Sequence, residues 1–283
     1  MKKVRLYELM TSNYMHNQYM YGAYKHYEGR DSEFFVLKGV MLKEYAETMA
    51  LDYSCLKIKY YENKFSLVIR LLLDIIKNEH KIVITGCSTY WILILSLISR
   101  SNSLDIHLHG QFFGSKNSKF KHKIWKFMSK YVSLKLACPY YSGDVKVQIL
   151  RHIHELPAVA QNQVKDFNRK NKKIIGILSG TGRAKWKGFE KLKDLEELGY
   201  KVVYYEPAIN ISDEWLNYRN FMREVDYLFL NPVNDYFLYS PSGVITDSKN
   251  YEKPMIAFDD NPFILRLIHS GCNNFKLISS VKN

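Results

Sequence analysis

Hydrophobic and polar positions along this chain follow two alternating periods. Short apolar runs indicate buried strands, and longer segments with an apolar residue at every third or fourth position indicate helices that bury one side. In the first half of the chain, this pattern predicts strands at residues 34–37, 82–84, 105–109 and 134–138, and helices at 65–77, 90–99 and 121–133.

The second half of the chain repeats the same order of elements. Strands are expected at residues 174–178, 201–205, 227–230 and 255–258, and helices at 188–198, 215–223 and 243–250. Strands that alternate with helices pair in parallel and carry helices on both faces of the sheet. The predicted fold class is therefore α/β, with one Rossmann-like sheet in each half.

A polar, strongly basic segment separates the two halves. The sequence QNQVKDFNRKNKK, residues 161–173, follows Leu156-Pro157 and has the composition of a linker. A length of 283 residues is also more than one hydrophobic core usually holds. We therefore expect two domains, residues 1–160 and 161–283, facing each other across a cleft.

The charge of the chain narrows the class of partner. Forty-one basic residues against 28 acidic ones give a net charge of +13, which favours nucleotide phosphates, anionic lipid or nucleic acid. No RNA- or DNA-binding motif is present, and nucleic acid is not expected. The four cysteines form no CxxC pair, so they resemble thiols of a reducing cytosol. Without a signal-peptide core or a run of about 18 apolar residues, we expect a cytoplasmic protein, soluble or peripheral at the inner face of the cell membrane.

The first loop with candidate chemistry follows the strand at 174–178 and reads SGTGRAKWKG. Ligands of open α/β sheets bind beyond the carboxyl ends of the strands. The small residues Gly180 and Thr181 let backbone amides approach a ligand, while Arg183 offers a forked donor and Lys187 a compact cation, a combination suited to a diphosphate. A flexible turn with solvated cations fits the loop equally well.

The second loop opens the sequence SPSGVITDSKNYEKP. Ser242 and Gly243 begin a helix whose unpaired N–H groups and dipole favour a phosphate. Asp247 lies one helical turn further on the same face, where its carboxylate can reach a sugar hydroxyl. The alternative is that Ser242 is a plain helix cap and Asp247 a solvated helix residue.

These two loops, with VDYLFLNP between them, resemble the donor lobe of GT-B glycosyltransferases, which use nucleotide-activated sugars. The resemblance covers residues 172–265, and the first half matches by its layout alone. It implies that residues 161–283 bind a nucleoside-diphosphate sugar, UDP-linked, as substrate and without a cofactor. Residues 1–160 would form the acceptor-side domain.

The resemblance also implies roles for single residues. Arg183 and Lys187 would grip the donor diphosphate, the helix start at Ser242 and Gly243 would bind phosphate, and Asp247 would hold the ribose. Electrostatic stabilisation of the leaving diphosphate needs no metal, and the chain has no Asp-x-Asp motif.

Histidines of the first half are the candidates on the acceptor side. Family members often carry a histidine at the end of a first-domain strand, where it contacts the transferred sugar, which implies that role for His109. His107 alternates to the same face of the strand and competes for the role. His16, in TSNYMHNQY, is a candidate in an acceptor-binding loop.

A basic, aromatic segment completes the candidates. Residues 115–135 contain no acid, and apolar residues at 124, 127, 128, 131 and 132 fall on one helical face beside Lys123, Lys126 and Lys130. We expect this stripe to pack on its own sheet and the lysines to attract anionic lipid.

The expected function is a metal-independent glycosyltransferase that acts on a glycan or polyprenyl-linked acceptor in surface polysaccharide synthesis. Two alternatives stay open. Tyr239 stands where the family pattern has a glutamate, and family members usually continue into further C-terminal helices, which fits a catalytically impaired, membrane-associated scaffold. Another nucleotide-binding Rossmann-type enzyme, such as an epimerase, is the second alternative, although GxGxxG is missing.

Overall fold

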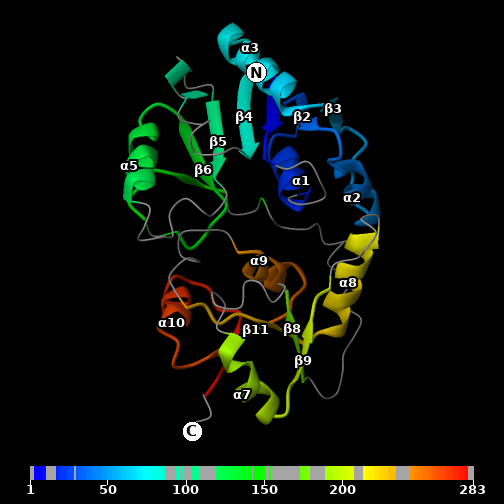
Figure 1. Cartoon of the computed structure of the whole chain (residues 1–283), viewed down its shortest axis with the longest axis vertical. Helices are drawn as coiled ribbons and strands as arrows, with labels where there is room; N and C mark the ends of the chain where they lie inside the picture. The colour runs from blue at the N-terminus through cyan, green and yellow to red at the C-terminus, as the bar shows by residue number, and fades with distance from the viewer. Residues whose placement is uncertain are drawn as a thin grey trace. The chain divides into compact units, whose positions relative to one another are not determined.

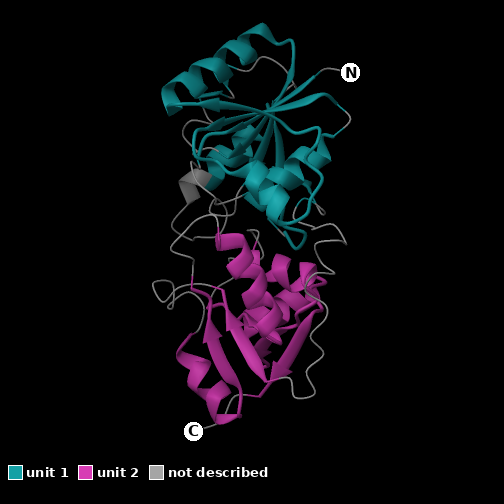
Figure 2. Cartoon of the chain, turned by 90° about the vertical axis from the view of Figure 1, so that its right-hand side faces the viewer, with its two compact units in different colours: residues 1–154 teal, residues 155–283 magenta. Residues whose placement is uncertain are grey.

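The structure is a computed structural model that describes residues 3–10, 17–28, 30–86, 94–95, 97–98, 104–108, 119–141, 143–150, 153, 173–178, 189–206, 213–233 and 242–279. The chain divides into two compact units, Met1–His154 and Glu155–Asn283 (Figure 2). The expected boundary, between residues 160 and 161, falls outside the described residues and stays a prediction.

The first unit is built on a seven-stranded sheet with the order β3-β2-β1-β4-β5-β6-β7 (Figure 1). Every pairing in it is parallel. Its strands are β1 (Val4–Glu8), β2 (Ser32–Leu37), β3 (Lys57–Tyr61), β4 (Lys81–Gly86), β5 (Leu104–Leu108), β6 (Ser133–Leu136) and β7 (Gln148–Ile149).

Helices cover both faces of this sheet. The described ones are α1 (Asn17–His26), α2 (Leu42–Thr48), α3 (Lys64–Lys77) and α5 (Lys119–Met128), with residues 94, 95, 97 and 98 also helical. Leu71 of α3, Leu95 and Trp125 of α5 join one core cluster with Ile84 and Ile106 of the sheet, so these three helical segments pack on the same face. The helix α1 covers the other face of the sheet. It contacts α2, and Tyr19 of α1 and Tyr27 just after it bond to His107 and Asp105 of β5.

The second unit is a smaller sheet of the same kind, with the order β12-β11-β10-β8-β9 and parallel pairing throughout. Its strands are β8 (Ile174–Ile177), β9 (Lys201–Tyr204), β10 (Tyr227–Phe229), β11 (Met255–Phe258) and β12 (Phe275–Ile278). Its helices are the 3-10 turn η3 (Phe189–Lys191), α7 (Leu192–Glu197), α8 (Glu214–Glu224), α9 (Gly243–Asn250) and α10 (Pro262–His269). The α/β class with two Rossmann-like sheets is thus confirmed.

A buried ion cluster joins α3 to β1. The Asp74 side chain is 1% exposed. Its Oδ1 lies 2.5 Å from Arg5 Nη1 and 3.1 Å from Arg70 Nη2, and the Tyr7 hydroxyl donates to its Oδ2 at 2.5 Å. Burial, followed by the bond to Asp74, raises the pKa of Tyr7. The single Asp74 carboxylate is therefore shared by two guanidinium groups, and Glu33 lies 3.8 Å from Arg5 as a second acid.

The predicted apolar stripe of the basic segment is wrong in part. The core takes Trp125, Met128 and Val132, whereas Phe127 and Tyr131 are exposed and their rings lie 5.1 Å apart. The reason is that the core side of α5 is centred on Trp125 and Met128, which at about 100° per residue turns Phe127 away from the core, while Tyr131 lies beyond the end of the helix. Within the described ranges, none of the helices combines the length and hydrophobicity that a bilayer crossing needs.

Candidate functional site

The helix α9 begins at the carboxyl edge of the second sheet, because it connects β10 to its parallel neighbour β11. Ser242 is its N-cap, and the Ser242 hydroxyl accepts from the Ile245 amide at 3.4 Å. The predicted helix, residues 243–250, is confirmed at both ends. The first turn of α9 therefore offers backbone N–H groups at the edge where α/β proteins bind ligands.

Gly243, the first residue of this turn, is exposed. Among the described residues, a Cβ at Gly243 would meet only Asp247 Oδ2, at 4.0 Å. An anionic group can therefore approach the amides of the first turn closely.

Asp247 is buried, with 7% of its surface exposed, so the alternative of a solvated helix residue is wrong. The Tyr218 hydroxyl, from α8, donates to Asp247 Oδ2. The Tyr218 ring in turn packs edge-on against Tyr205 and Tyr251, with centroids 5.0 and 6.3 Å away. Tyr205 and Tyr251 thus pack around Tyr218, which holds the Asp247 carboxyl beside the start of α9.

Burial raises the pKa of Asp247 to about 7, and the hydrogen bond from Tyr218 acts in the opposite direction. Desolvation disfavours the charged form of a carboxyl, which explains the sign. Near neutral pH, the group changes from a protonated donor to a carboxylate that accepts hydrogen bonds from hydroxyl groups.

This raised pKa predicts how stability depends on pH. Because the pKa of Asp247 is about 7 in the folded chain and 3.8 unfolded, the folded state holds a proton that the unfolded state lacks between those values. Stability should therefore fall as pH rises from about 4 to 7. Each pKa unit is worth about 1.4 kcal/mol, so the loss is of the order of 4 kcal/mol.

Urea unfolding of the Asp247→Asn variant measures this effect. An asparagine does not titrate, so the variant should gain stability relative to the wild type as pH is raised from 5 to 8. Asp194→Asn, in α7, is the control and should keep the wild-type pH profile. Parallel profiles for wild type and Asp247→Asn would contradict the raised pKa.

A buried carboxyl also lies at the carboxyl edge of the first sheet. Glu8 ends β1 and is fully buried. It accepts from the Met10 amide at 2.8 Å and from the Thr85 hydroxyl at 3.1 Å. Gly86 makes room for it, since a Cβ at Gly86 would lie 2.2 Å from Glu8 Oε1. The sequence patterns missed Glu8, and the available signal was an acid that ends an apolar strand.

Asn17, the first residue of α1, is a second polar residue that the patterns missed. It is buried, and among the residues that the structure describes neither its side-chain oxygen nor its nitrogen has a hydrogen-bond partner. A buried amide without a partner costs about 1–3 kcal/mol. Because α1 follows β1, the carboxyl edge of this sheet carries a polar group that a ligand can satisfy.

His107 is a core residue. It is 1% exposed, with its Nδ1 2.8 Å from the Tyr19 hydroxyl and its Nε2 3.3 Å from the Tyr27 hydroxyl. Tyr27 also donates to Asp105 at 2.9 Å. Since both ring nitrogens face tyrosines of α1 and its following turn, His107 does not compete for a role in substrate binding.

The remaining sequence-predicted site residues lie outside the described part of the chain and stay predictions. They are His16, His109, Gly180, Thr181, Arg183, Lys187 and Tyr239. The structure thus describes Ser242, Gly243 and Asp247 of the predicted donor site, and places them together on one turn of α9.

Comparisons with known proteins identify the fold. No protein-family model matches the chain, and no curated protein is similar enough in sequence to match. Among solved structures, Anabaena HepE in complex with UDP is 13% identical, with a TM-score of 0.57 over 99% of this chain and 86% of that one.

Two further solved structures have a similar fold over nearly the whole chain. Arabidopsis thaliana UGT89C1 complexed with UDP-L-rhamnose is 11% identical, with a TM-score of 0.52 over 100% of this chain and 87% of that one. A Listeria monocytogenes protein named as a UDP-N-acetylglucosamine 2-epimerase is 12% identical, with a TM-score of 0.50 over 99% and 85% of the two chains. The chain therefore has the GT-B fold that its loops predict.

Proposed function

We propose that the chain is a glycosyltransferase that moves a sugar from a nucleoside-diphosphate sugar to a glycan or lipid-linked acceptor. The observation that carries this proposal is the accessible first turn of α9 with the buried Asp247 carboxyl beside it. The complexes of similar fold support it further, since they contain UDP and UDP-L-rhamnose.

Donor binding follows from the chemistry of the second unit. We assign the phosphates to the amides at Ser242 and Gly243, and the ribose hydroxyls to the Asp247 carboxylate. Arg183 and Lys187 would neutralise the charge that develops on the leaving diphosphate, so this step needs no metal ion. Gly180 and Thr181 would let their backbone approach the same phosphates.

The carboxyl edge of the first sheet would hold the acceptor. We assign contact with the transferred sugar to His109, acceptor binding to His16, and removal of the acceptor hydroxyl proton to Glu8. The Glu8 carboxyl lies at this edge, where it accepts from the Met10 amide and the Thr85 hydroxyl, and a carboxylate so placed has the chemistry of a general base. The net charge of +13 fits an acceptor at an anionic, cytoplasmic membrane face, in surface polysaccharide synthesis.

A thermal-shift screen tests the donor class. We expect one of UDP, GDP, dTDP and CMP to raise the melting temperature, UDP foremost, because a ligand that binds only the folded state stabilises it. Arg183→Ala and Lys187→Ala should weaken the shift, whereas Lys193→Ala, on the exposed side of α7, should leave it unchanged. NAD and oligonucleotides are the negative controls.

Two outcomes would favour other functions. The Listeria neighbour makes an epimerase the second candidate, and isomerisation of a nucleotide sugar without any acceptor would replace the transferase with it. No shift with any nucleotide would contradict donor binding and favour the scaffold that Tyr239 suggests.

A further inference from the structure

The helix α3 is apolar on the side that faces away from its sheet. Phe65 and Ile76 are 75% and 68% exposed, and Ile69 and Leu73 between them are also exposed. Their spacing of four, four and three residues aligns all four along one side of the helix. Because Leu67 and its buried neighbours already form the core side, core packing does not account for this outer stripe.

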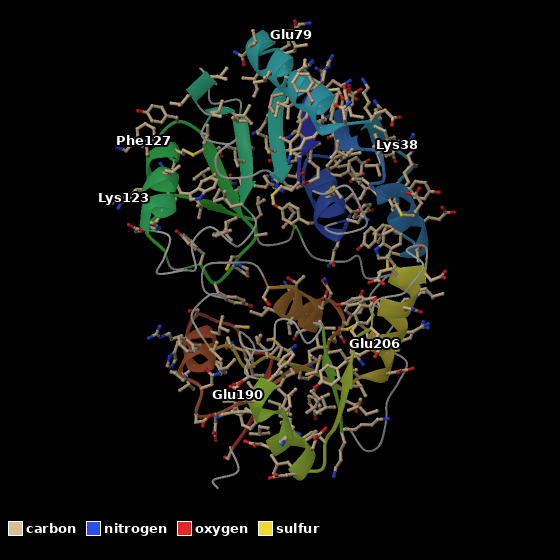
Figure 3. All side chains as sticks on the ribbon, viewed as in Figure 1. Lys38, Glu79, Lys123, Phe127, Glu190 and Glu206 are labelled. Atoms are coloured by element: carbon tan, nitrogen blue, oxygen red, sulfur yellow. The ribbon has the colours of Figure 1, made fainter. Side chains whose placement is uncertain are left out.

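The other helical segments on the same face of the sheet add exposed apolar residues. Ile94 and Leu97 are exposed, as are Phe127 and Tyr131. Figure 3 shows Phe127 and Lys123 directed outward from α5. We call α3, residues 94–98 and α5 the outer layer of the first sheet. Large contiguous apolar patches on soluble proteins mark interaction sites, so we ask what this surface binds.

The accessible charges of α3 are basic. Lys64 and Lys77 are exposed at its two ends, and Arg70 is partly exposed. The acid of this helix, Asp74, is buried and bound to Arg5 and Arg70. The exposed acids nearest in sequence to α3, Glu62 and Glu79, lie beyond its two ends.

The two flanking acids, Glu62 and Glu79, are exposed and offset part of the charge of Lys64 and Lys77. Glu62 is paired with Lys38 at 3.2 Å, and Glu79 follows the C-cap Asn78. On α5, Lys123 and Lys126 are exposed, with Lys126 bound to Asp144 at 2.8 Å. The exposed lysines of this surface outnumber its exposed acids: they are Lys64, Lys77, Lys123, Lys126 and Lys130, against Glu62, Glu79 and Asp144. The outer layer therefore combines apolar side chains with a positive rim.

We propose that the outer layer of the first sheet docks on an anionic lipid bilayer, with Phe65, Ile69, Leu73 and Ile76 entering the interface. Apolar side chains flanked by basic ones are what an interfacial helix needs, since the apolar part is buried in lipid and the cations contact head groups. A second copy of the chain would bring the same positive rim against itself, so charge complementarity selects anionic lipid.

This surface deepens the membrane part of the proposed function, but its binding can be measured without a nucleotide. Vesicles of equal parts phosphatidylglycerol and phosphatidylcholine should sediment the full chain, whereas pure phosphatidylcholine vesicles should not. Phe65→Ser with Ile76→Ser should lower the partition coefficient about tenfold or more, because both side chains lose their transfer into lipid. Lys64→Gln with Lys77→Gln should lower it on anionic vesicles only.

Matched variants in the second unit are the controls. Leu216→Ser with Leu265→Ser removes two exposed apolar residues, Lys193→Gln with Lys201→Gln removes two exposed lysines, and both should bind vesicles as the wild type does. The proposal is overturned if Phe65→Ser with Ile76→Ser binds anionic vesicles normally, or if the wild type ignores them. It is also overturned if sedimentation velocity finds a dimer that this double variant dissociates.

A thermal shift with UDP on the same proteins separates the two proposals. Normal UDP binding without vesicle binding would reject the docking surface alone, and vesicle binding without any nucleotide shift would reject the donor site alone. A tryptophan placed by Phe65→Trp should also gain a blue-shifted fluorescence with anionic vesicles, while Leu216→Trp should not.

Discussion

Asp247→Asn should weaken UDP binding by about ten- to 150-fold and leave the melting temperature at pH 8 unchanged or higher. The affinity falls because hydrogen bonds from ribose hydroxyls to a carboxylate are charge-assisted, worth about 1.5–3 kcal/mol, and an amide replaces the charge. The stability does not fall, because burial already disfavours the ionised form of this group and an asparagine oxygen can still accept from Tyr218. Isothermal titration with UDP and a thermal melt measure the two effects.

Uridine makes this measurement specific to the ribose. It carries no phosphate that titrates near neutral pH, so its affinity for the wild type should rise as Asp247 ionises around pH 7. Asp194→Asn serves again as the matched acid-to-amide control. If Asp247→Asn binds UDP and uridine as tightly as the wild type, the ribose assignment is wrong.

Asp74→Ala should destabilise the first unit by about 3–5 kcal/mol, the largest effect on stability that we expect. The carboxylate is the common partner of Arg5, Arg70 and Tyr7, and its removal leaves Arg5 with only the more distant Glu33, at 3.8 Å. Urea unfolding followed by circular dichroism measures the change.

Glu62→Ala is the control for this change, because the ion pair of Glu62 with Lys38 is exposed on both sides. Exposed ion pairs contribute little, so its unfolding midpoint should stay at the wild-type value. If Asp74→Ala and Glu62→Ala lower the unfolding midpoint equally, the prediction that the buried ion pair contributes more to stability is wrong.

Local signals explain which parts of the fold the sequence predicts. Both α9 and β11 begin and end at the expected residues. Ser242 caps the start of the helix, and the left-handed backbone of Glu252 with Pro254 separates its end from the strand. The strand β3 went unpredicted because it is an edge strand whose sequence, KIKYY, is mostly exposed. The helix α1 was missed because tyrosines such as Tyr19 and Tyr24 form its buried side, and they give a weak apolar pattern.

Of the candidate site, too, only the residues with a local sequence signal could be predicted. Asp247 could be predicted from its spacing to Gly243, one helical turn, whereas its partner Tyr218 comes from another helix 29 residues earlier in the chain. Glu8 could not be recognised as buried, because Thr85 and Gly86 reach it only through the pairing of β1 with β4. Contacts between distant segments create such environments, and no local pattern records them.

The close approach of Gly86 to Glu8 limits how this edge of the first sheet can evolve. Any side chain at position 86 would occupy the space of the Glu8 carboxyl, so a substitution there displaces the acid from Thr85 and from the Met10 amide. The two positions should therefore vary together among related chains, with a larger residue at 86 accompanied by a shorter one at 8. An alignment of homologues would then reveal this carboxyl as a coupled pair of columns.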